Sequence, residues 1–226
     1  MEKYAIIVAG GSGQRMGQKQ PKQFLEIHGK PLIWYTVRAF LEAYDDMVVI
    51  LVLPEAYLTT GHELFGDELH AGRLQTVKGG NNRFQSVKNG LTHVPTASTV
   101  FVHDGVRCLV TTALIQRCFE ATISSGSAVP AIEPPDSIRL INNVTGDQNS
   151  SVLDRSRIRL IQTPQTFPAA VLQEAFTQPY HEKFSDEATV VETAGFTVNL
   201  VEGERSNIKV TYPIDLLIAE QLLRRR

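Results

Sequence analysis

The chain has 226 residues, of which 42% are hydrophobic and 20% charged, and its formal net charge is -2 at pH 7. This length suits one α/β domain, or one domain with an appendage. The near-neutral charge gives no global electrostatic case for nucleic-acid binding. No apolar run approaches the ~18 residues of a membrane span, and the N-terminus lacks the features of a signal peptide. We therefore expect a cytoplasmic protein that binds neither nucleic acid nor membranes.

Apolar runs alternate with amphipathic stretches over the first 132 residues. The β-branched and apolar runs predict strands at 4–8, 47–53, 74–77, 99–103 and 127–132. Helices are predicted at 31–44, 55–64, 82–93 and 111–126. Alternation of strand and helix is typical of a doubly wound, mostly parallel sheet of the Rossmann-like kind, so the fold class is α/β.

This alternation breaks at residues 133–165. The stretches 137–141 and 151–155 flank the polar sequence NNVTGDQNS, which predicts a hairpin that is not a βα unit. A lone two-stranded ribbon is barely stable in water, so it must pack on its own domain or on another subunit. Helices at 168–177, 186–194 and 213–226 and a strand at 196–201 complete the prediction. We expect one domain, 1–226, with a projecting β-arm at 133–160.

Four polar segments follow predicted strands. They are 9–22, 78–86, 103–107 and 207–211. Ligands of open α/β sheets bind at the carboxyl ends of the strands. Each segment alone has an ordinary structural explanation, such as a turn or a helix cap, but together they predict one site at one edge of the sheet.

The first of these segments, which begins with VAGGSGQRM, predicts a triphosphate site. Backbone N–H groups of the glycine-rich turn can surround phosphate oxygens, and Arg15 and Lys22 add two positive charges nearby. A dinucleotide fold would place glycine where Met16 stands, and no G-K-[ST] follows the glycines as a P-loop requires. Glycines with two cations suit a triphosphate whose negative charge grows during a reaction.

Further motifs narrow this interpretation to one family. The stretches VAGGSGQRM, PKQF, GGNNRFQSV, VHDGVR, TPQTF, SDEA and EGERSNIKVT occur in order along essentially the whole chain. Together they resemble the 2-C-methyl-D-erythritol 4-phosphate cytidylyltransferase family, nucleotidyltransferases of the non-mevalonate isoprenoid pathway. The resemblance implies transfer of a cytidylyl group from CTP to the polyol phosphate, which gives 4-diphosphocytidyl-2-C-methyl-D-erythritol and pyrophosphate.

The resemblance also implies roles for individual residues. Those implied in catalysis are Arg15, Lys22, Arg155 and Lys209. Those implied in CTP binding are Ala9, Gly10, Gly11, Ser12, Gly13, Gly80, Asn81, Ser86, Asp104 and Gly105. Those implied in binding the polyol phosphate are Asp104, Arg107, Ser137, Arg155, Thr163, Ser185 and Lys209. Family members form homodimers through a β-arm, so Ser137 and Arg155 are expected to serve the partner's site.

The chain departs from the family pattern at a few positions. Gly105-Val106-Arg107-Cys108 stands where the family has A-A-R-P, and Ser137 and Ser185 replace two threonines. Serine keeps a hydroxyl that can donate and accept, so substrate binding is expected to survive.

The implied chemistry needs no general base, because the nucleophile is a phosphate monoester that is largely dianionic at pH 7. His103 is therefore interpreted as a packing residue. A Mg²⁺ cofactor is expected on the CTP phosphates, without a dedicated protein site. The histidines and cysteines lack metal-ligand spacing, and Cys108 and Cys118 suit a reduced cytosolic pair.

Other functions stay open at this point. A cytidylyltransferase for another polyol phosphate, such as ribitol 5-phosphate, would share every phosphate-binding residue. An NAD-dependent oxidoreductase is disfavoured by Met16, and a glycosyltransferase by the absence of Asp-x-Asp at Asp104-Gly105-Val106. A non-catalytic nucleotide-binding module would leave Lys22 and Lys209 without a role.

Overall fold

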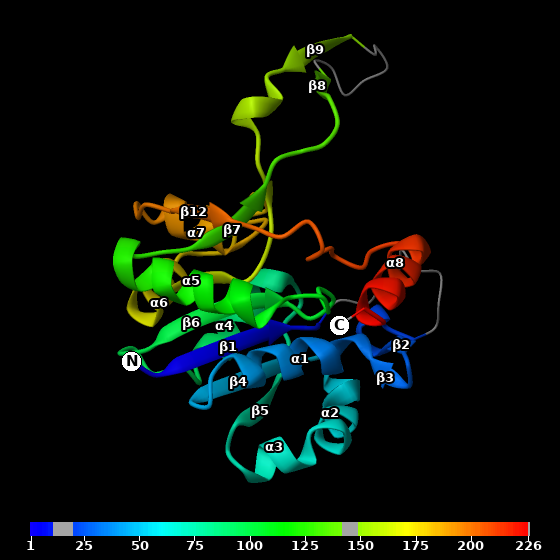
Figure 1. Cartoon of the computed structure of the whole chain (residues 1–226). Helices are drawn as coiled ribbons and strands as arrows, with labels where there is room; N and C mark the ends of the chain where they lie inside the picture. The colour runs from blue at the N-terminus through cyan, green and yellow to red at the C-terminus, as the bar shows by residue number, and fades with distance from the viewer. Residues whose placement is uncertain (11–19, 142–148, 226) are drawn as a thin grey trace.

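A computed structural model describes residues 1–10, 20–141 and 149–225. Its central element is a five-stranded sheet, most of whose strands are labelled in Figure 1. The strands, in their spatial order, are β11 (Gln165–Pro168), β6 (Thr99–Asp104), β1 (Lys3–Val8), β4 (Met47–Leu53) and β5 (Leu74–Lys78). The last four run parallel, whereas β11 pairs antiparallel with β6. The predicted mostly parallel α/β fold is confirmed.

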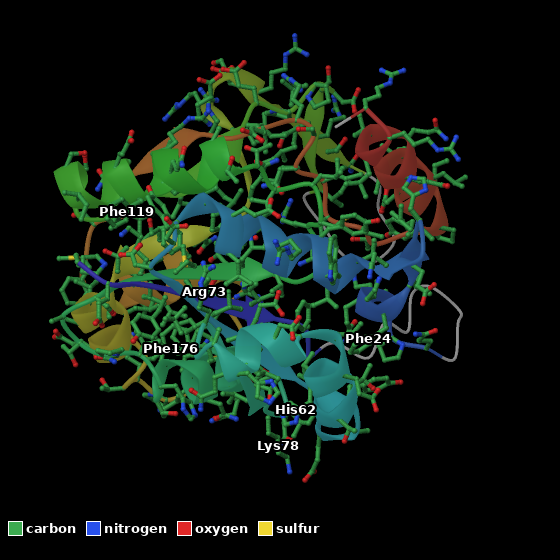
Figure 2. The ribbon with its side chains drawn as sticks, turned by 60° about the horizontal axis from the view of Figure 1, so that its bottom comes forward. Phe24, His62, Arg73, Lys78, Phe119 and Phe176 are labelled. Atoms are coloured by element: carbon green, nitrogen blue, oxygen red, sulfur yellow. The ribbon has the colours of Figure 1, made fainter. Side chains whose placement is uncertain are left out.

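Helices cover both faces of this sheet. One layer contains α1 (Leu32–Ala43) and α5 (Thr112–Ser125), and the other contains α4 (Arg83–Leu91), α6 (Ala169–Ala175) and α7 (Glu187–Thr193). Successive strand side chains point to opposite faces, so Ile7 of β1 packs in the first layer and Ile6 in the second. Phe119 and Phe176, both labelled in Figure 2, belong to these two separate cores.

Smaller elements complete the chain outside the arm. The helices α2 (Leu58–Leu64) and α3 (Gly66–His70) connect β4 to β5, and α8 (Pro213–Leu223) lies at the C-terminal end. A short hairpin of β2 (Glu26–Ile27) and β3 (Lys30–Pro31) precedes α1. No helix within the described residues is long and apolar enough to span a bilayer.

The chain also builds a second, three-stranded sheet that the sequence did not predict. Its order is β10 (Leu160–Ile161), β7 (Val129–Ile132) and β12 (Leu200–Glu202). The predicted strands at 127–132 and 196–201 therefore pair here and not in the main sheet. The reason is that β11 occupies the free edge of β6, and Ala128, just before β7, pairs with Thr166 of β11 in an isolated bridge.

The predicted hairpin is confirmed and stands away from both sheets (Figure 1). It consists of β8 (Ile138–Ile141) and β9 (Ser150–Leu153), paired antiparallel, and its tip, 142–148, lies outside the described residues. Leu140, Ile141 and Val152 on it are 53%, 54% and 68% exposed. The hairpin thus carries apolar side chains that no other described part of the chain covers.

Candidate functional site

A cleft of about 440 Å³ opens at the carboxyl ends of β1 and β6. Its lining comprises Val8, Ala9, Gly10, Lys22, Gln23, Gly80, Asn81, Asn82, Arg83, Ser86, Asp104, Val106 and Lys209. All four polar segments singled out in the sequence contribute to this lining. Their predicted convergence at one edge of the sheet is therefore confirmed.

The floor of the cleft is formed by backbone that follows β1 and β6. Ala9 N–H donates to the carbonyl of Val52 at 2.9 Å, and Gly105 N–H donates to the carbonyl of Val8 at 2.9 Å. A Cβ at Gly105 would lie 2.7 Å from Cδ1 of Ile33. The absence of a side chain at Gly105 lets the turn after β6 lie close against β1 and α1.

The wall beside β5 is the turn that leads into α4. Gly80 N–H donates to Ser86 Oγ at 3.0 Å, and that hydroxyl donates to the carbonyl of Asn82 at 2.8 Å. Asn82 caps the helix by accepting from Gln85 N–H at 2.8 Å. Ser86 thus fixes the turn that carries Gly80 and Asn81, and it is itself 2% exposed.

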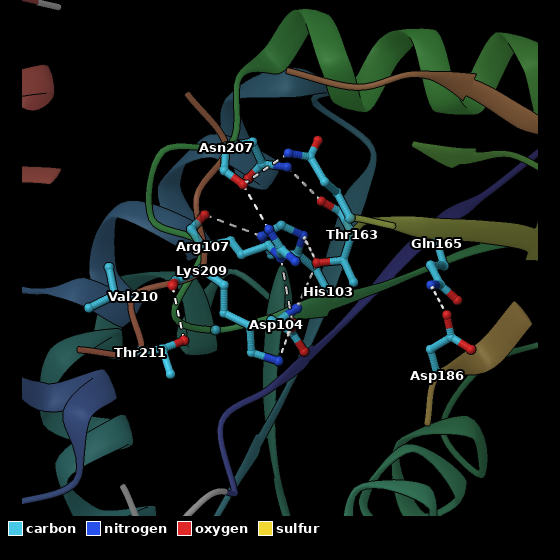
Figure 3. A network of polar contacts seen from close by, with 12 residues as sticks. His103, Asp104, Arg107, Thr163, Gln165, Asp186, Asn207, Lys209, Val210 and Thr211 are labelled. Carbon is cyan, nitrogen blue, oxygen red and sulfur yellow. Dashed lines mark hydrogen bonds and ion pairs between the residues drawn. The ribbon is translucent and has the colours of Figure 1, made fainter. Parts of the chain in front are cut away.

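Asp104 is the centre of charge in the cleft (Figure 3). Its Oδ2 lies 2.9 Å from Lys209 Nζ and 3.5 Å from Arg107 Nε, and its Oδ1 lies 3.4 Å from Arg83 Nε. Burial alone would raise the pKa of Asp104, but the charges of Arg83, Lys209 and Arg107 together hold it well below its usual range. Asp104 is therefore a carboxylate at any physiological pH.

Lys22 and Lys209 both line the cleft, and both are held by residues 207–211, which pass close to the turn after β6. Lys22 Nζ donates to the carbonyl of Val210 at 3.1 Å, and Val210 N–H donates to the carbonyl of Val106 at 3.1 Å. Asn207, which is fully buried, anchors this segment by donating to the carbonyl of Thr163 at 2.8 Å. The NIKVT motif thus places two ammonium groups at one site.

Behind the cleft, Thr163 and His103 form a buried polar contact (Figure 3). Thr163 Oγ1 accepts from Asp104 N–H at 3.1 Å and lies 2.9 Å from His103 Nδ1. Burial lowers the pKa of His103 to about 3, with Arg107 acting in the same direction and Asp104 opposing. His103 is therefore a neutral packing residue, as the sequence indicated.

The Arg107 side chain also contacts other residues of the same chain. Its Nη1 donates to the carbonyl of Asn207 at 2.8 Å, and its side chain is 11% exposed. Burial lowers the pKa of Arg107, against the effect of Asp104. Arg107 is not among the residues that line the cleft, so its implied contact with the polyol phosphate stays a prediction.

Several predicted site residues do not line this cleft. Ser137 and Arg155 lie on the arm, where Arg155 Nη1 donates to the carbonyl of Pro135 at 3.0 Å. Ser185 is exposed just before α7, with its Oγ 3.4 Å from Thr189 Oγ1. The remaining predictions, Gly11, Ser12, Gly13 and Arg15, lie outside the described residues.

The site also contains residues that received no role from the sequence. Gln23 Nε2 donates to the carbonyl of Ala9, and Arg83 forms a bidentate ion pair with Glu187. Arg83 stands inside the quoted GGNNRFQSV motif and Glu187 inside SDEA, so both residues lie in motifs that the sequence had already singled out. Their pairing across 104 positions could not be inferred without the fold.

The donor set of the described residues suits a metal ion that arrives with its ligand. Those residues contain no group of three or more His, Cys, Asp or Glu side chains able to hold a metal. Asp104 is the single carboxylate among the lining residues, and it already faces three cations. Magnesium commonly keeps substrate phosphates and water as ligands, which fits this arrangement.

Residues 4–225 match the model of a protein family described as 2-C-methyl-D-erythritol 4-phosphate cytidylyltransferase. A relative of that name from Phocaeicola vulgatus is 42% identical, over 99% of this chain and 100% of the relative. A second, from Bacteroides thetaiotaomicron, is 41% identical with the same coverage of both chains. The crystal structure of 2-C-methyl-D-erythritol 4-phosphate cytidylyltransferase from Thermus thermophilus matches with a TM-score of 0.78 and 32% identity, over 99% of this chain and 100% of that one.

Proposed function

Because the chain belongs to the 2-C-methyl-D-erythritol 4-phosphate cytidylyltransferase family, we propose that it transfers a cytidylyl group from CTP to 2-C-methyl-D-erythritol 4-phosphate. The products are 4-diphosphocytidyl-2-C-methyl-D-erythritol and pyrophosphate, and the former serves isoprenoid precursor synthesis by the non-mevalonate pathway. The observation that carries this proposal is the pair of ammonium groups, Lys22 and Lys209, in a cleft that is also lined by the turn at Gly80 and Asn81.

The chemical obstacle is the attack of one anion on another. A phosphate monoester oxygen attacks the α-phosphorus of CTP, and the bond to the pyrophosphate oxygen breaks. No proton has to be removed from the dianionic nucleophile, which agrees with a buried, neutral His103. Lys22 and Lys209, together with Arg15 on the predicted glycine loop, stabilise the charge that develops on the phosphates.

Asp104 positions a cationic side chain in this scheme. Asp104 holds Lys209 at 2.9 Å and so fixes one ammonium group before any substrate arrives. Its fixed negative charge also offers an acceptor to a substrate hydroxyl, whereas a second phosphate would be repelled. We assign the nucleotide contacts to Ala9, Gly10, Gly80, Asn81 and Ser86, which line the cleft, and to Gly105 in the turn after β6.

We assign Mg²⁺ to the triphosphate of CTP and not to a cage of protein ligands. When bound, the ion neutralises phosphate charge and so favours attack at phosphorus. This chain contributes the two lysines and the backbone that position the phosphates around it. The cytoplasmic location expected from the sequence stays a prediction.

We further propose that the active unit is a homodimer in which the arm of one chain completes the site of the other. Support comes from the exposed apolar residues Leu140, Ile141 and Val152 on the hairpin and Leu160 and Leu200 on the neighbouring sheet. Ser137 and Arg155 lie at the base of the same hairpin, away from the cleft of their own chain. The partner's Arg155 would then bring a guanidinium to the acceptor phosphate.

The proposed activity is tested by pyrophosphate release with CTP and three acceptors: methylerythritol 4-phosphate, ribitol 5-phosphate and a hexose 1-phosphate. We expect methylerythritol 4-phosphate to give the highest kcat/KM. A higher value with ribitol 5-phosphate would move the assignment to another polyol phosphate, and release with the hexose phosphate alone would overturn it.

A second panel tests the nucleotide. A pocket that pairs with the edge of cytosine leaves polar groups unpaired when uracil or adenine enters. CTP should therefore exceed UTP and ATP by roughly 10²-fold or more in kcat/KM. Equal values for the three nucleotides would contradict the cytidylyl assignment.

A further inference from the structure

The ion pair between Arg83 and the buried Glu187 is one that the proposed chemistry does not use. Arg83 at the start of α4 contacts both carboxylate oxygens of Glu187, with Nη2 to Oε2 at 2.9 Å. The same guanidinium turns its Nε toward Asp104 Oδ1 at 3.4 Å. One side chain therefore joins the carboxylate in the cleft to the first turn of α7.

Because Glu187 is buried, its carboxylate depends on the contact with Arg83. Its side chain is 1% exposed, and burial raises its pKa against the effect of Arg83. Burial would lower the pKa of Arg83, but Glu187 and Asp104 outweigh it and raise that pKa. A buried carboxylate that lost its guanidinium would be strongly unfavourable, so the segment around Glu187 follows the position of Arg83.

A second contact from α4 reaches the same segment on the other side of Ser185. Phe84, the neighbour of Arg83, stacks on Phe184 with ring centroids 5.6 Å apart and on Phe176 at 4.6 Å. Arg83 and Phe84 thus contact residues 187 and 184, which flank Ser185. The first turn of α4 holds both ends of the stretch that carries this serine.

The sheet fixes the same stretch from below. Gln165 of β11 donates from Nε2 to Asp186 Oδ2 at 2.8 Å (Figure 3). Its Oε1 accepts from Ala188 N–H at 2.8 Å. Gln165 itself is 1% exposed. Ser185 therefore sits on a rigid support whose position relative to the turn at Gly80 depends on Arg83.

We propose that Arg83 is a positioning residue of the transfer reaction: by bridging Glu187 and Asp104 it holds the acceptor-binding residues in register with the CTP-binding turn that precedes α4. This inference rests on the proposed function, because it takes Ser185 and Asp104 as contacts of the polyol phosphate. Misplacing reacting groups by about 1 Å can cost about 10²-fold in rate. Loss of the bridge should therefore affect the acceptor and the turnover more than the affinity for CTP.

The first experiment measures steady-state kinetics and CTP binding for Arg83→Ala. We expect kcat/KM for methylerythritol 4-phosphate to fall by about 30- to 100-fold, since the acceptor contacts lose their register. The Kd of CTP should change by less than about threefold, because the lysines and the backbone groups of the cleft remain. Arg38→Ala is the matched control, because Arg38 pairs with Glu68 at 3.0 Å on another part of the surface. It should keep wild-type kinetics.

Chemical rescue separates positioning from a general loss of structure. Millimolar methylguanidinium should restore part of the kcat of Arg83→Ala, and the same concentration of urea should not. Arg83→Lys keeps the charge but loses the bidentate geometry, so we expect it to fold with a Tm close to wild type and to lose about 10-fold in kcat/KM.

The outcomes distinguish the two levels of the proposal. A wild-type chain that does not turn over methylerythritol 4-phosphate would remove the proposed function. A wild-type chain that is active, with Arg83→Ala and Arg83→Lys equally active, would overturn only the positioning role. An equal loss of CTP affinity and kcat, without rescue by methylguanidinium, would show that Arg83 has a merely structural or nucleotide-binding role. If Arg83→Ala does not fold, the kinetics of Arg83→Lys decide between these outcomes.

Discussion

The cleft at the edge of the main sheet and the projecting arm differ in how far their side chains find partners within the chain. At the cleft, Asp104 has three cationic partners, and the Thr163 hydroxyl and the His103 ring are hydrogen-bonded to each other in the interior. On the arm, Leu140 and Val152 are more than half exposed. The cleft is thus largely complete within one chain, whereas the arm leaves apolar surface that a single chain does not bury.

Because of this difference, activity should depend on the cleft and on the arm in two different ways. The charges at the cleft are fixed by the fold before a substrate binds, so each of them should have its own effect on rate. The arm should affect activity only through contact with a second chain, because its apolar residues are stabilised by burial and not by exposure to water. Disturbing the two regions should therefore give different signatures, in kcat for the cleft and in association for the arm.

The largest effect is expected at Lys22. Replacing it in Lys22→Ala should lower kcat by about 10²–10³-fold, the scale of losing one preorganised donor to developing charge. The Kd of CTP should change far less, because Lys209 and the backbone groups remain. Stopped-flow or steady-state kinetics with binding titrations measure both quantities. Lys30→Ala is the control, since Lys30 lies outside the cleft, on the β2–β3 hairpin near the ring of Trp34.

A Lys22→Ala enzyme with normal kcat and only a raised KM would mean that Lys22 binds substrate equally in the ground and transition states. That result would remove Lys22 from the proposed catalytic role and leave the rest of the cleft unaffected.

A smaller effect on rate is expected from the arm. Val152→Asp places a charge on the exposed apolar face of the hairpin and should shift the chain toward monomer in sedimentation velocity. Without the partner's Arg155, kcat/KM should fall by about 10- to 100-fold, which corresponds to one charge-assisted hydrogen bond of about 1.5–3 kcal/mol. Ile123→Asp is the matched control, because Ile123 is 55% exposed on α5. Full activity of a monomeric Val152→Asp chain would refute a role of the arm in the site.

The smallest of these effects concerns the buried His103. Its pKa is about 3 in the folded chain against 6.5 in the unfolded one, so the unfolded state binds a proton first as the pH falls. The contribution of His103 to the free energy of unfolding is therefore fully present above about pH 6.5 and decreases by about 1.4 kcal/mol per pH unit from there down to about pH 3. Urea unfolding should show that His103→Gln lacks about 2 kcal/mol of this loss between about pH 6.5 and about pH 5. Identical pH slopes for the two proteins would show that His103 is not buried as a neutral ring.

The sequence predicted most of the framework because its signals are local. Runs such as 47–53 can only be buried strands, and β4 (Met47–Leu53) covers that stretch. The helix predicted at 111–126 is observed as Thr112–Ser125, with Gly126 at φ 83° ending it. Polar segments that follow parallel strands must meet at one edge, so their convergence was also predictable.

What could not be predicted depends on contacts between distant residues. The strand β11 (Gln165–Pro168) is short and antiparallel, and nothing in its sequence shows that it pairs with β6. The bridge from Arg83 to Glu187 and Asp104 appears only when α4, α7 and β6 are brought together. The exposed residues of the arm could be found from the sequence, but not the surface that covers them.

The most direct test of this division between cleft and arm mixes two impaired variants, Lys22→Ala and Arg155→Ala. If the partner's Arg155 completes each site, one site of a mixed dimer carries both defects and the other carries none. Random exchange makes about half of the dimers mixed, so about a quarter of all sites should recover activity. If Lys22 and Arg155 act within one chain, every site keeps one defect. Activity that stays at the level of the separate variants, after a mass tag has verified exchange, would contradict the shared site.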